Sequence, residues 1–279
     1  GWGELADRRT PITPTGQRSH GTTGMLRGIY SAASGMVVAS EAQEVNAANL
    51  ADSSTPGYRQ RGVTFETFDR VLGRTQESTG DLTGAAVSGV YHDFRPGAFQ
   101  QTGNPFDFAL PDAGSFFVVR GPNGPLYTRA GIFQPDSNGR LVTPSGYPLL
   151  GEDGPIRIPP EANRVSVGED GSVVADGEPV GTVRLARFAK LRELVAAGPS
   201  LYRAPPAAGL QPANSKLVVG VREASNVQPA DAMVRMMIGV RYYEAAQRSL
   251  RSISDSLQLH TRPQSFLMRP RPPRSTPVR

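Results

Sequence analysis

A chain of 279 residues is long enough to bury a hydrophobic core, and at roughly 150 residues per domain it corresponds to one large domain or two smaller ones. It contains no cysteine, which excludes disulfide bonds and thiolate metal sites; an oxidising environment is permitted but not indicated. The 31 glycines and 25 prolines make up about a fifth of the chain, above the average of roughly 12%, and predict many turns between short strands.

The formal charge of +5 is concentrated near the C-terminus, so the rest of the chain is close to neutral. Five arginines of the last eighteen residues account for it: Arg262, Arg269, Arg271, Arg274 and Arg279. A dedicated nucleic-acid surface would be expected to carry clustered basic residues on a folded face or along a helix. The near-neutral body therefore argues against such a surface.

No apolar run approaches the ~20 residues of a membrane-spanning helix. Residues 1–24 also lack the apolar core of a secretory signal peptide. If this chain leaves the cytoplasm, we expect it to do so without a cleaved signal peptide.

Residues 1–24 carry Thr, Pro, Gly and Arg without periodicity and are predicted to be a disordered extension, after which Met25 could be the natural start. The segment 25–58 is predicted to be a helix and a turn, with an alanine-rich, proline-free helix over residues 26–51. One face of this helix has the alternating spacings of three and four that are typical of a heptad seam. The seam residues are Leu26, Ile29, Ala33, Met36, Ser40, Gln43, Ala47 and Leu50.

The sequence following this helix predicts a sharp stop. Pro56 disfavours a helical conformation at Thr55, and Gly57 permits a positive backbone dihedral. We expect the turn to redirect the chain, with Tyr58 anchoring it against a neighbouring subunit.

A connecting segment is predicted over residues 59–84, and a β-rich middle domain over residues 85–222. In the connecting segment Phe65, Phe68, Val71 and Leu72 could form a short helix. In the middle domain strand-like runs alternate with Gly-containing turns such as Pro122–Gly124 and Asp176–Gly177. The predicted strands include Phe106–Leu110, Phe116–Arg120, Val165–Val167 and Val183–Ala189.

A second long helix is predicted within residues 223–260. Ser225 and Asn226 offer side-chain oxygens for capping, and Pro229 suits the first turn. Residues 261–279 are predicted to be a disordered Arg/Pro tail. The second helix repeats the heptad spacing in Met233, Met236, Val240, Tyr243, Gln247, Leu250, Ser254 and Leu257, and Met237, Ala246 and Ile253 broaden this apolar face.

The predicted fold class is α+β, with long, coiled-coil-like terminal helices that flank a mainly antiparallel β middle domain. Periodicity alone is equally compatible with two helices of an isolated globular core. Polar residues such as Ser40, Gln43 and Ser254 interrupt the seams, so each helix would depend on packing from its neighbours. This favours helices that contact other subunits.

No catalytic constellation is found. His20 and His260 lie in or beside the predicted tails, His92 stands alone, and phosphate loops and nucleophile elbows are absent. Asp107 and Asp112 could act as an acid–base pair, but carboxylates beside turns are more often caps. We therefore expect no enzyme, no catalytic residue, no metal site and no cofactor.

Motifs at both ends and in the centre resemble the axial proteins of the bacterial flagellum, in the rod and hook-basal-body class. The terminal motifs are Met25–Met36, Ala48–Ala51 with Ser54–Arg59, Ser225–Val227, Ala232–Val234 and Tyr242–Ala245, and the central ones are Thr102–Leu110, Tyr127–Phe133 and Gly139–Tyr147. Gln228–Met233 and Arg241–Glu244 resemble the proximal rod members most. Ala48, Asp52 and Ser54 depart from the family's usual asparagines, and Pro111–Ser115 replaces a compact glycine turn.

The resemblance implies a structural subunit of the basal-body rod that polymerises through its terminal helices into a tubular axle transmitting torque. It also implies export through the flagellar type III apparatus, a periplasmic location, and contacts with its own copies and with other rod proteins, including the distal rod protein. The interface residues expected on this basis are Leu26, Ile29, Ala33, Met36, Ala47, Leu50, Tyr58, Met233, Met236, Val240, Tyr243, Leu250 and Leu257.

Two other functions remain open at this point. The Arg/Pro tail could make the protein a binding module for nucleic acid, an acidic membrane or peptidoglycan. A periplasmic hydrolase would instead need ionisable residues clustered in a pocket.

Overall fold

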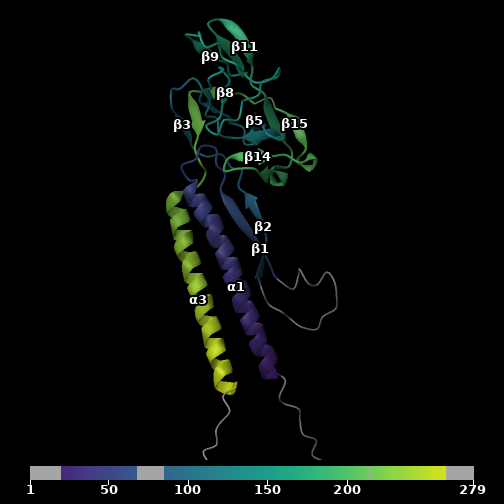
Figure 1. Ribbon diagram of the computed structural model, residues 1–279, viewed down its shortest axis with the longest axis vertical. Helices are drawn as coiled ribbons and strands as arrows, with labels where there is room; N and C mark the ends of the chain where they lie inside the picture. Colours follow the sequence, from purple (N-terminus) through teal and green to yellow (C-terminus); the bar gives the residue numbers. More distant parts are fainter. Residues whose placement is uncertain (1–19, 68–84, 214, 262–279) are drawn as a thin grey trace, which may run out of the picture.

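The computed structural model describes residues 20–67, 85–213 and 215–261, and it has the shape of a stalk that carries a head (Figure 1). Two long helices, α1 (His20–Ala51) and α3 (Pro229–Thr261), lie side by side as the stalk. Most strands form the head at one end of the stalk. The fold is α+β with mainly antiparallel sheets, as the sequence predicts.

Helix α1 begins at His20, six residues before the predicted start, so residues 20–24 are helical and are not part of a disordered extension. Propagating an existing helix adds one hydrogen bond per residue, which is why weak helix formers can join its end. The rest of the predicted extension, residues 1–19, lies outside the described residues, as does the predicted tail from residue 262 onward.

The end of α1 matches the predicted stop. Gly57 has φ +69°, and its N–H donates to the carbonyl of Glu223 at 2.9 Å. A Cβ at this position would collide with the backbone of Ala130, so only glycine lets the turn approach the head this closely. The turn thereby fixes the end of α1 against the head.

Helix α3 begins where the sequence predicts. The N–H of Val227 donates to the hydroxyl of Ser225 at 3.1 Å, Pro229 occupies the first helical position, and the N–H of Ala232 donates to the carbonyl of Gln228 at 3.0 Å. The helix continues to Thr261.

The two helices pack antiparallel and approach closely at glycines. A Cβ on Gly239 would lie 2.7 Å from Oε1 of Gln43, and one on Gly28 would lie 3.2 Å from Cδ1 of Ile253. The stalk is therefore a helical hairpin within one chain, closed by the head.

The contact face of α3 is rotated relative to the predicted seam. Met236, Gln247 and Leu250 are half-buried as expected, whereas Met233, Val240 and Ser254 are exposed. Close approach at Gly239 places that residue, and not Val240, opposite α1. Of the apolar seam residues whose side chains the structure describes, Met233, Val240 and Tyr243 are consequently exposed, and Met236 and Leu250 are half-buried.

A two-stranded ribbon of β1 (Arg61–Thr67) and β2 (Ala85–His92) runs beside α1 (Figure 1). The strands pair antiparallel with a bulge between Thr64 and Phe65. Phe65 is thus in a strand and not in the short helix considered from the sequence, because ladder pairing with β2 satisfies its backbone. The other residues of that helix, Phe68, Val71 and Leu72, lie outside the described residues.

The head is built from short strands and two 3-10 turns, η1 (Leu191–Glu193) and η2 (Pro206–Ala208). A six-stranded sheet has the order β13-β14-β6-β5-β12-β15, and smaller sheets pair β11-β10-β9, β16-β4, β17-β3 and β7-β8. The strands are β3 (Phe99–Gln101), β4 (Phe108–Ala109), β5 (Ser115–Gly121), β6 (Gly124–Thr128), β7 (Gln134–Pro135), β8 (Leu141–Val142), β9 (Val165–Val167), β10 (Ser172–Ala175), β11 (Glu178–Thr182), β12 (Leu185–Phe188), β13 (Val195–Ala196), β14 (Leu201–Arg203), β15 (Leu210–Pro212), β16 (Val218–Val219) and β17 (Val221–Glu223).

Strand β5 separates two hydrophobic cores. Phe117 and Val119 point into one core, whereas Phe116 and Val118 point into the other, since successive side chains of a strand face opposite sides. Burial on both faces explains why the sequence of β5 is a continuous apolar run and does not alternate between apolar and polar residues. The predicted strand over Phe116–Arg120 lies inside it.

Glycine turns connect the strands as expected. Asp176 and Gly177 both have positive φ, of 50° and 92°, which is the conformation of the two-residue hairpin turn that joins β10 to β11.

Among the described helices, neither α1 nor α3 is long and apolar enough to cross a membrane.

We expect Phe133→Ala to destabilise the head by about 3–5 kcal/mol, because the ring is 1% exposed and packs against Phe108 and Phe117. Urea unfolding followed by circular dichroism measures the change. Phe99→Ala, at a ring that is 47% exposed, is the matched control and should cost far less. Equal losses in the two variants would contradict this description of the core.

Candidate functional site: the stalk and its junction with the head

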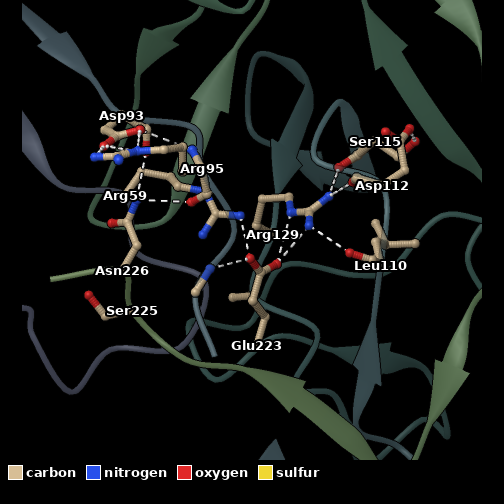
Figure 2. A network of polar contacts seen from close by, with 12 residues as sticks. Arg59, Asp93, Arg95, Leu110, Asp112, Ser115, Arg129, Glu223, Ser225 and Asn226 are labelled. Atoms are coloured by element: carbon tan, nitrogen blue, oxygen red, sulfur yellow. Dashed lines mark hydrogen bonds and ion pairs between the residues drawn. The ribbon is translucent and has the colours of Figure 1, made fainter. Parts of the chain in front are cut away.

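The stalk meets the head at a buried carboxylate that binds two arginines (Figure 2). Oε1 of Glu223 accepts a hydrogen bond from Nη2 of Arg59 at 2.6 Å, and Oε2 accepts one from Nε of Arg129 at 3.0 Å. The side chains of Arg59, Arg129 and Glu223 are fully buried. Because Arg59 follows α1, Arg129 follows β6 and Glu223 precedes α3, this triad joins three distant parts of the chain.

Arg129 also holds the loop that leads into β5. Its guanidinium donates to the carbonyl oxygens of Leu110, Asp112 and Ser115 as well as to Glu223. Burial lowers the pKa of Arg129 from its ordinary value, and the Glu223 carboxylate opposes this shift. The charge is therefore stabilised by a shell of acceptors inside the head.

Two asparagines attach the start of the ribbon to the two helices. The Asn49 side chain of α1 accepts from the N–H of Arg61 and donates to its carbonyl, both at 2.8 Å. Asn226, just before α3, accepts from the N–H of Gln60 at 2.7 Å and donates to the carbonyls of Asp93 and Arg95. Each side-chain amide thus makes hydrogen bonds with the backbone near residue 60 that a neighbouring strand would otherwise make.

Tyr58 lies inside its own subunit. Its side chain has no exposed surface, packs with Val227, Ala232 and Leu50, and donates to Oδ1 of Asn49 at 3.1 Å. Burial raises the pKa of this phenol. This placement differs from the expected contact with a neighbouring subunit, because a fully buried ring offers that neighbour no surface.

His92 lies at the base of the head, next to the aromatic side chains of the second core. Its ring meets that of Tyr202 edge-on, with centroids 5.4 Å apart. Burial, together with the nearby Arg61 guanidinium, lowers the pKa of His92 to about 4. The histidine is therefore neutral near pH 7.

The two aspartates considered as an acid–base pair act as caps. Asp107 accepts from the Asn104 amide at 3.1 Å. Asp112 accepts from the hydroxyl of Ser115 at 2.7 Å and from the N–H of Gly114 at 3.2 Å. Both carboxylates are engaged in local turns, as turn-adjacent aspartates usually are.

The head also has an open groove of about 1160 Å³ beside β12 and β15. Its charged lining includes Glu169, which pairs with Lys216 at 3.2 Å, and Asp170. Hydrogen bonds from Ser172 lower the pKa of Asp170, the opposite of the raised pKa that a general acid needs. Asp170 therefore does not resemble a general acid.

The expected interface residues of the stalk differ in their exposure. Ile29, Ala33, Met36, Leu50, Met236 and Leu250 are half-buried, whereas Ala47, Met233, Val240 and Tyr243 are exposed. The side chains of Leu26 and Leu257 lie outside the described residues. Further large apolar side chains are exposed on the stalk, namely Tyr30, Val37, Val234, Met237, Ile238 and Tyr242.

Comparisons with known proteins agree with this architecture. Residues 112–175 match the family described as flagellar hook protein FlgE/F/G D1 domain, and residues 219–260 match flagellar basal body rod FlgEFG protein C-terminal. The flagellar basal-body rod protein FlgF of Mesorhizobium japonicum is 31% identical over 237 residues, which cover 83% of this chain and 95% of that protein. The chain belongs to the flagellar basal-body rod protein family.

Other relatives in the rod family are similar over the same extent. FlgF of Salmonella typhimurium is 29% identical over 246 residues, covering 83% of this chain and 96% of that protein. FlgG of Bacillus subtilis is 30% identical over 262 residues, covering 84% and 97%. This rod-family protein is thus a structural subunit of the flagellar basal body, whereas the similar identities to FlgF and FlgG leave its subtype a prediction.

The sequence reasoning missed the triad of this rod-family subunit. Arg59 and Arg129 lie in the motifs Ser54–Arg59 and Tyr127–Phe133, whereas Glu223 lies two residues before the motif Ser225–Val227. Their position in or next to these motifs is the signal by which the sequence could have pointed to the three residues. Their pairing across 164 and 94 positions of sequence required the fold.

We expect Glu223→Gln to lower the free energy of unfolding by about 3–5 kcal/mol, because it leaves two buried guanidinium groups without a counter-charge. Urea unfolding measures this loss. Glu178→Gln on an exposed edge is the matched control, expected to change stability by less than about 0.5 kcal/mol. A Glu223→Gln variant as stable as this control would contradict a stabilising triad.

His92 predicts a loss of stability in mild acid. Its folded pKa of about 4 lies below the ordinary 6.5, so the unfolded chain binds a proton that the folded chain excludes. Its contribution is complete above pH 6.5 and is lost as the pH falls towards 4. Urea midpoints at pH 7 and pH 4.5 should therefore differ less in His92→Phe than in the wild type; an equal difference would exclude His92 as the cause.

Proposed function

We propose that this rod-family subunit polymerises through its terminal helices into a tubular axle, and that this axle transmits torque. The observation that supports the proposal most directly is the exposed apolar surface of the stalk. Met233, Met237 and Tyr242 on α3 are 52%, 57% and 68% exposed. Surfaces of this kind on an elongated helical hairpin are typical of sites that pack against other proteins.

In the polymer, coiled-coil-like packing would extend from the hairpin to neighbouring subunits. Inside one subunit each helix covers only part of its partner, which leaves residues such as Val37 and Val240 exposed. Marginal helices gain stability when further helices cover these stripes. The proposed interface therefore includes the exposed members of the expected set, Ala47, Met233, Val240 and Tyr243.

Torque transmission requires that the head and the stalk rotate together. The triad of Arg59, Glu223 and Arg129 connects both helix roots to the head without exposing a charged atom pair to water. Asn49 and Asn226 add bonds from each helix to the ribbon. A junction with this many buried contacts resists bending better than a single linker would.

The proposed partners are copies of this chain, other rod proteins including the distal rod protein, and the flagellar export apparatus. The resemblance of the terminal motifs supports a proximal rod subtype, and it supports export without a cleaved signal peptide into the periplasm. The alternative function, a basic-tailed binding module, depends on residues 262–279, which lie outside the described residues.

We expect the double variant Met233→Glu/Val240→Glu to abolish swimming while leaving the subunit folded, because both side chains are exposed and charges there would have to be desolvated in an interface. Soft-agar motility, with circular dichroism of the purified subunit, tests this expectation. Val195→Glu/Leu210→Glu, on exposed apolar residues of the head, is the matched control and should swim.

Deletion of residues 26–58 or of residues 226–260 gives the coarser test. Normal motility after both deletions would contradict the axle function altogether.

A further inference from the structure

The Arg59 guanidinium has buried hydrogen-bond donors beyond the one that binds Glu223. Nη2 of Arg59 makes the contact with Glu223 at 2.6 Å. Nε and Nη1 are also buried, and neither has a hydrogen-bond partner among the described residues. Arg129 differs, because its guanidinium binds Glu223 and three carbonyl oxygens (Figure 2). The triad therefore leaves one of its two arginines incompletely satisfied.

Two more buried donors lie near Arg59. In the part of the chain that the structure describes, the buried side-chain nitrogen and oxygen atoms without a partner are Nε and Nη1 of Arg59, Nε of Arg61 and the Tyr202 hydroxyl. Burial raises the pKa of Tyr202, and the guanidinium groups of Arg59 and Arg61 are close enough to oppose that rise. Arg61 also lies opposite His92 in the ribbon, and the His92 ring is 5.4 Å from that of Tyr202. All four atoms are thus at one place, where the stalk meets the head.

Positive charge exceeds negative charge at this place. The single carboxylate of Glu223 serves both arginines of the triad, and Arg61 forms no ion pair within the described ranges. Asp93 also interacts with Arg59, but both of its oxygens bind Arg95. Burying a charge is costly unless it is paired and hydrogen-bonded. A negatively charged ligand would meet both needs.

We propose that one small monovalent inorganic anion, of the size and charge of chloride, binds between Arg59, Arg61 and Tyr202. All four unpartnered atoms can donate, and an anion can accept from each of them. A water molecule would need acceptors for its own two hydrogens, and the Tyr202 oxygen is the only acceptor in this set. Because Arg59 and Tyr202 are fully buried, the occupant has to be small.

The bound anion goes beyond the proposed axle function and adds a ligand to the junction. Arg59 follows α1, Arg61 begins β1, and Tyr202 lies in β14 of the six-stranded sheet. The ion therefore connects the end of the first helix and the start of the ribbon to the head. Since it binds only where these parts meet, the folded subunit becomes more stable as the anion concentration rises.

Thermal unfolding of the purified full chain, followed by circular dichroism, tests this site. Sodium chloride replaces sodium gluconate at constant ionic strength, so that screening of surface charges stays the same. Gluconate is too large for a fully buried site. We expect the midpoint temperature to rise with chloride and to continue rising only in proportion to the logarithm of its concentration, as binding to one site requires.

Tyr202→Phe separates anion binding from packing. The loss of one donor to a charged ligand should weaken chloride binding about tenfold or more. In gluconate the variant should be at least as stable as the wild type, because it lacks a buried hydroxyl without a partner among the described residues. In chloride the wild type should be the more stable of the two. Tyr127→Phe, in the same core, is the matched control and should keep the chloride response of the wild type.

Arg61→Met removes a positive charge and a donor, so its chloride response should be at least about tenfold weaker as well. Its backbone contacts with Asn49 do not involve the substituted side chain. Arg203→Met, on the exposed residue next to Tyr202, is the matched control and should respond as the wild type does.

Crystals soaked in sodium bromide locate the ion by its anomalous scattering. A bromide peak in contact with Nη1 of Arg59 and the Tyr202 hydroxyl would support the site. Bromide peaks only at other places would show an adventitious ion only and would overturn it. Equal chloride responses in the wild type and Tyr202→Phe would also overturn it, and would assign the donors to ordered water.

Discussion

The structure depends on one buried carboxylate. Glu223 neutralises Arg59 and Arg129 where the two helices leave the head, so it joins three segments that are far apart in the sequence. Two arginines on a single glutamate leave an excess positive charge in the interior, so the carbonyl oxygens of Leu110 and Ser115 are needed to stabilise it. The loop before β5 and the roots of the stalk are consequently fixed by the same interaction.

This arrangement relates the fold to assembly. A hairpin whose roots are held rigidly can present two outer faces at a constant separation, which a repeating contact between subunits requires. The inner faces of α1 and α3 use glycines for close approach, and the bulky residues that this rotation leaves outside, such as Met237 and Ile238, are those available to neighbours. Stability within the subunit and surface for assembly thus come from different sides of the same helices.

The head shows why local patterns predicted strands well and their partners poorly. Strand β5 is apolar on both faces because it separates two cores, and the Asp176–Gly177 turn specifies the β10–β11 hairpin through positive φ. Both features are local. The sheet order β13-β14-β6-β5-β12-β15 places β14 beside β6, with Leu201 opposite Thr128, only through non-local packing, which the pattern of a single segment does not encode.

The sequence by itself determined the α+β class, the stop at Pro56–Gly57, the start at Pro229 and the family resemblance, because propensity, capping and motif order are local properties of the chain. Tertiary structure alone decided which helix face is inner, that Tyr58 is buried within its own subunit, and that Glu223 meets both arginines. The physical reason is that heptad spacing predicts an apolar helix face but does not fix which residues of that face meet the partner helix. The contact at Gly239 and the desolvation of Glu223 depend on atoms from distant segments of the chain.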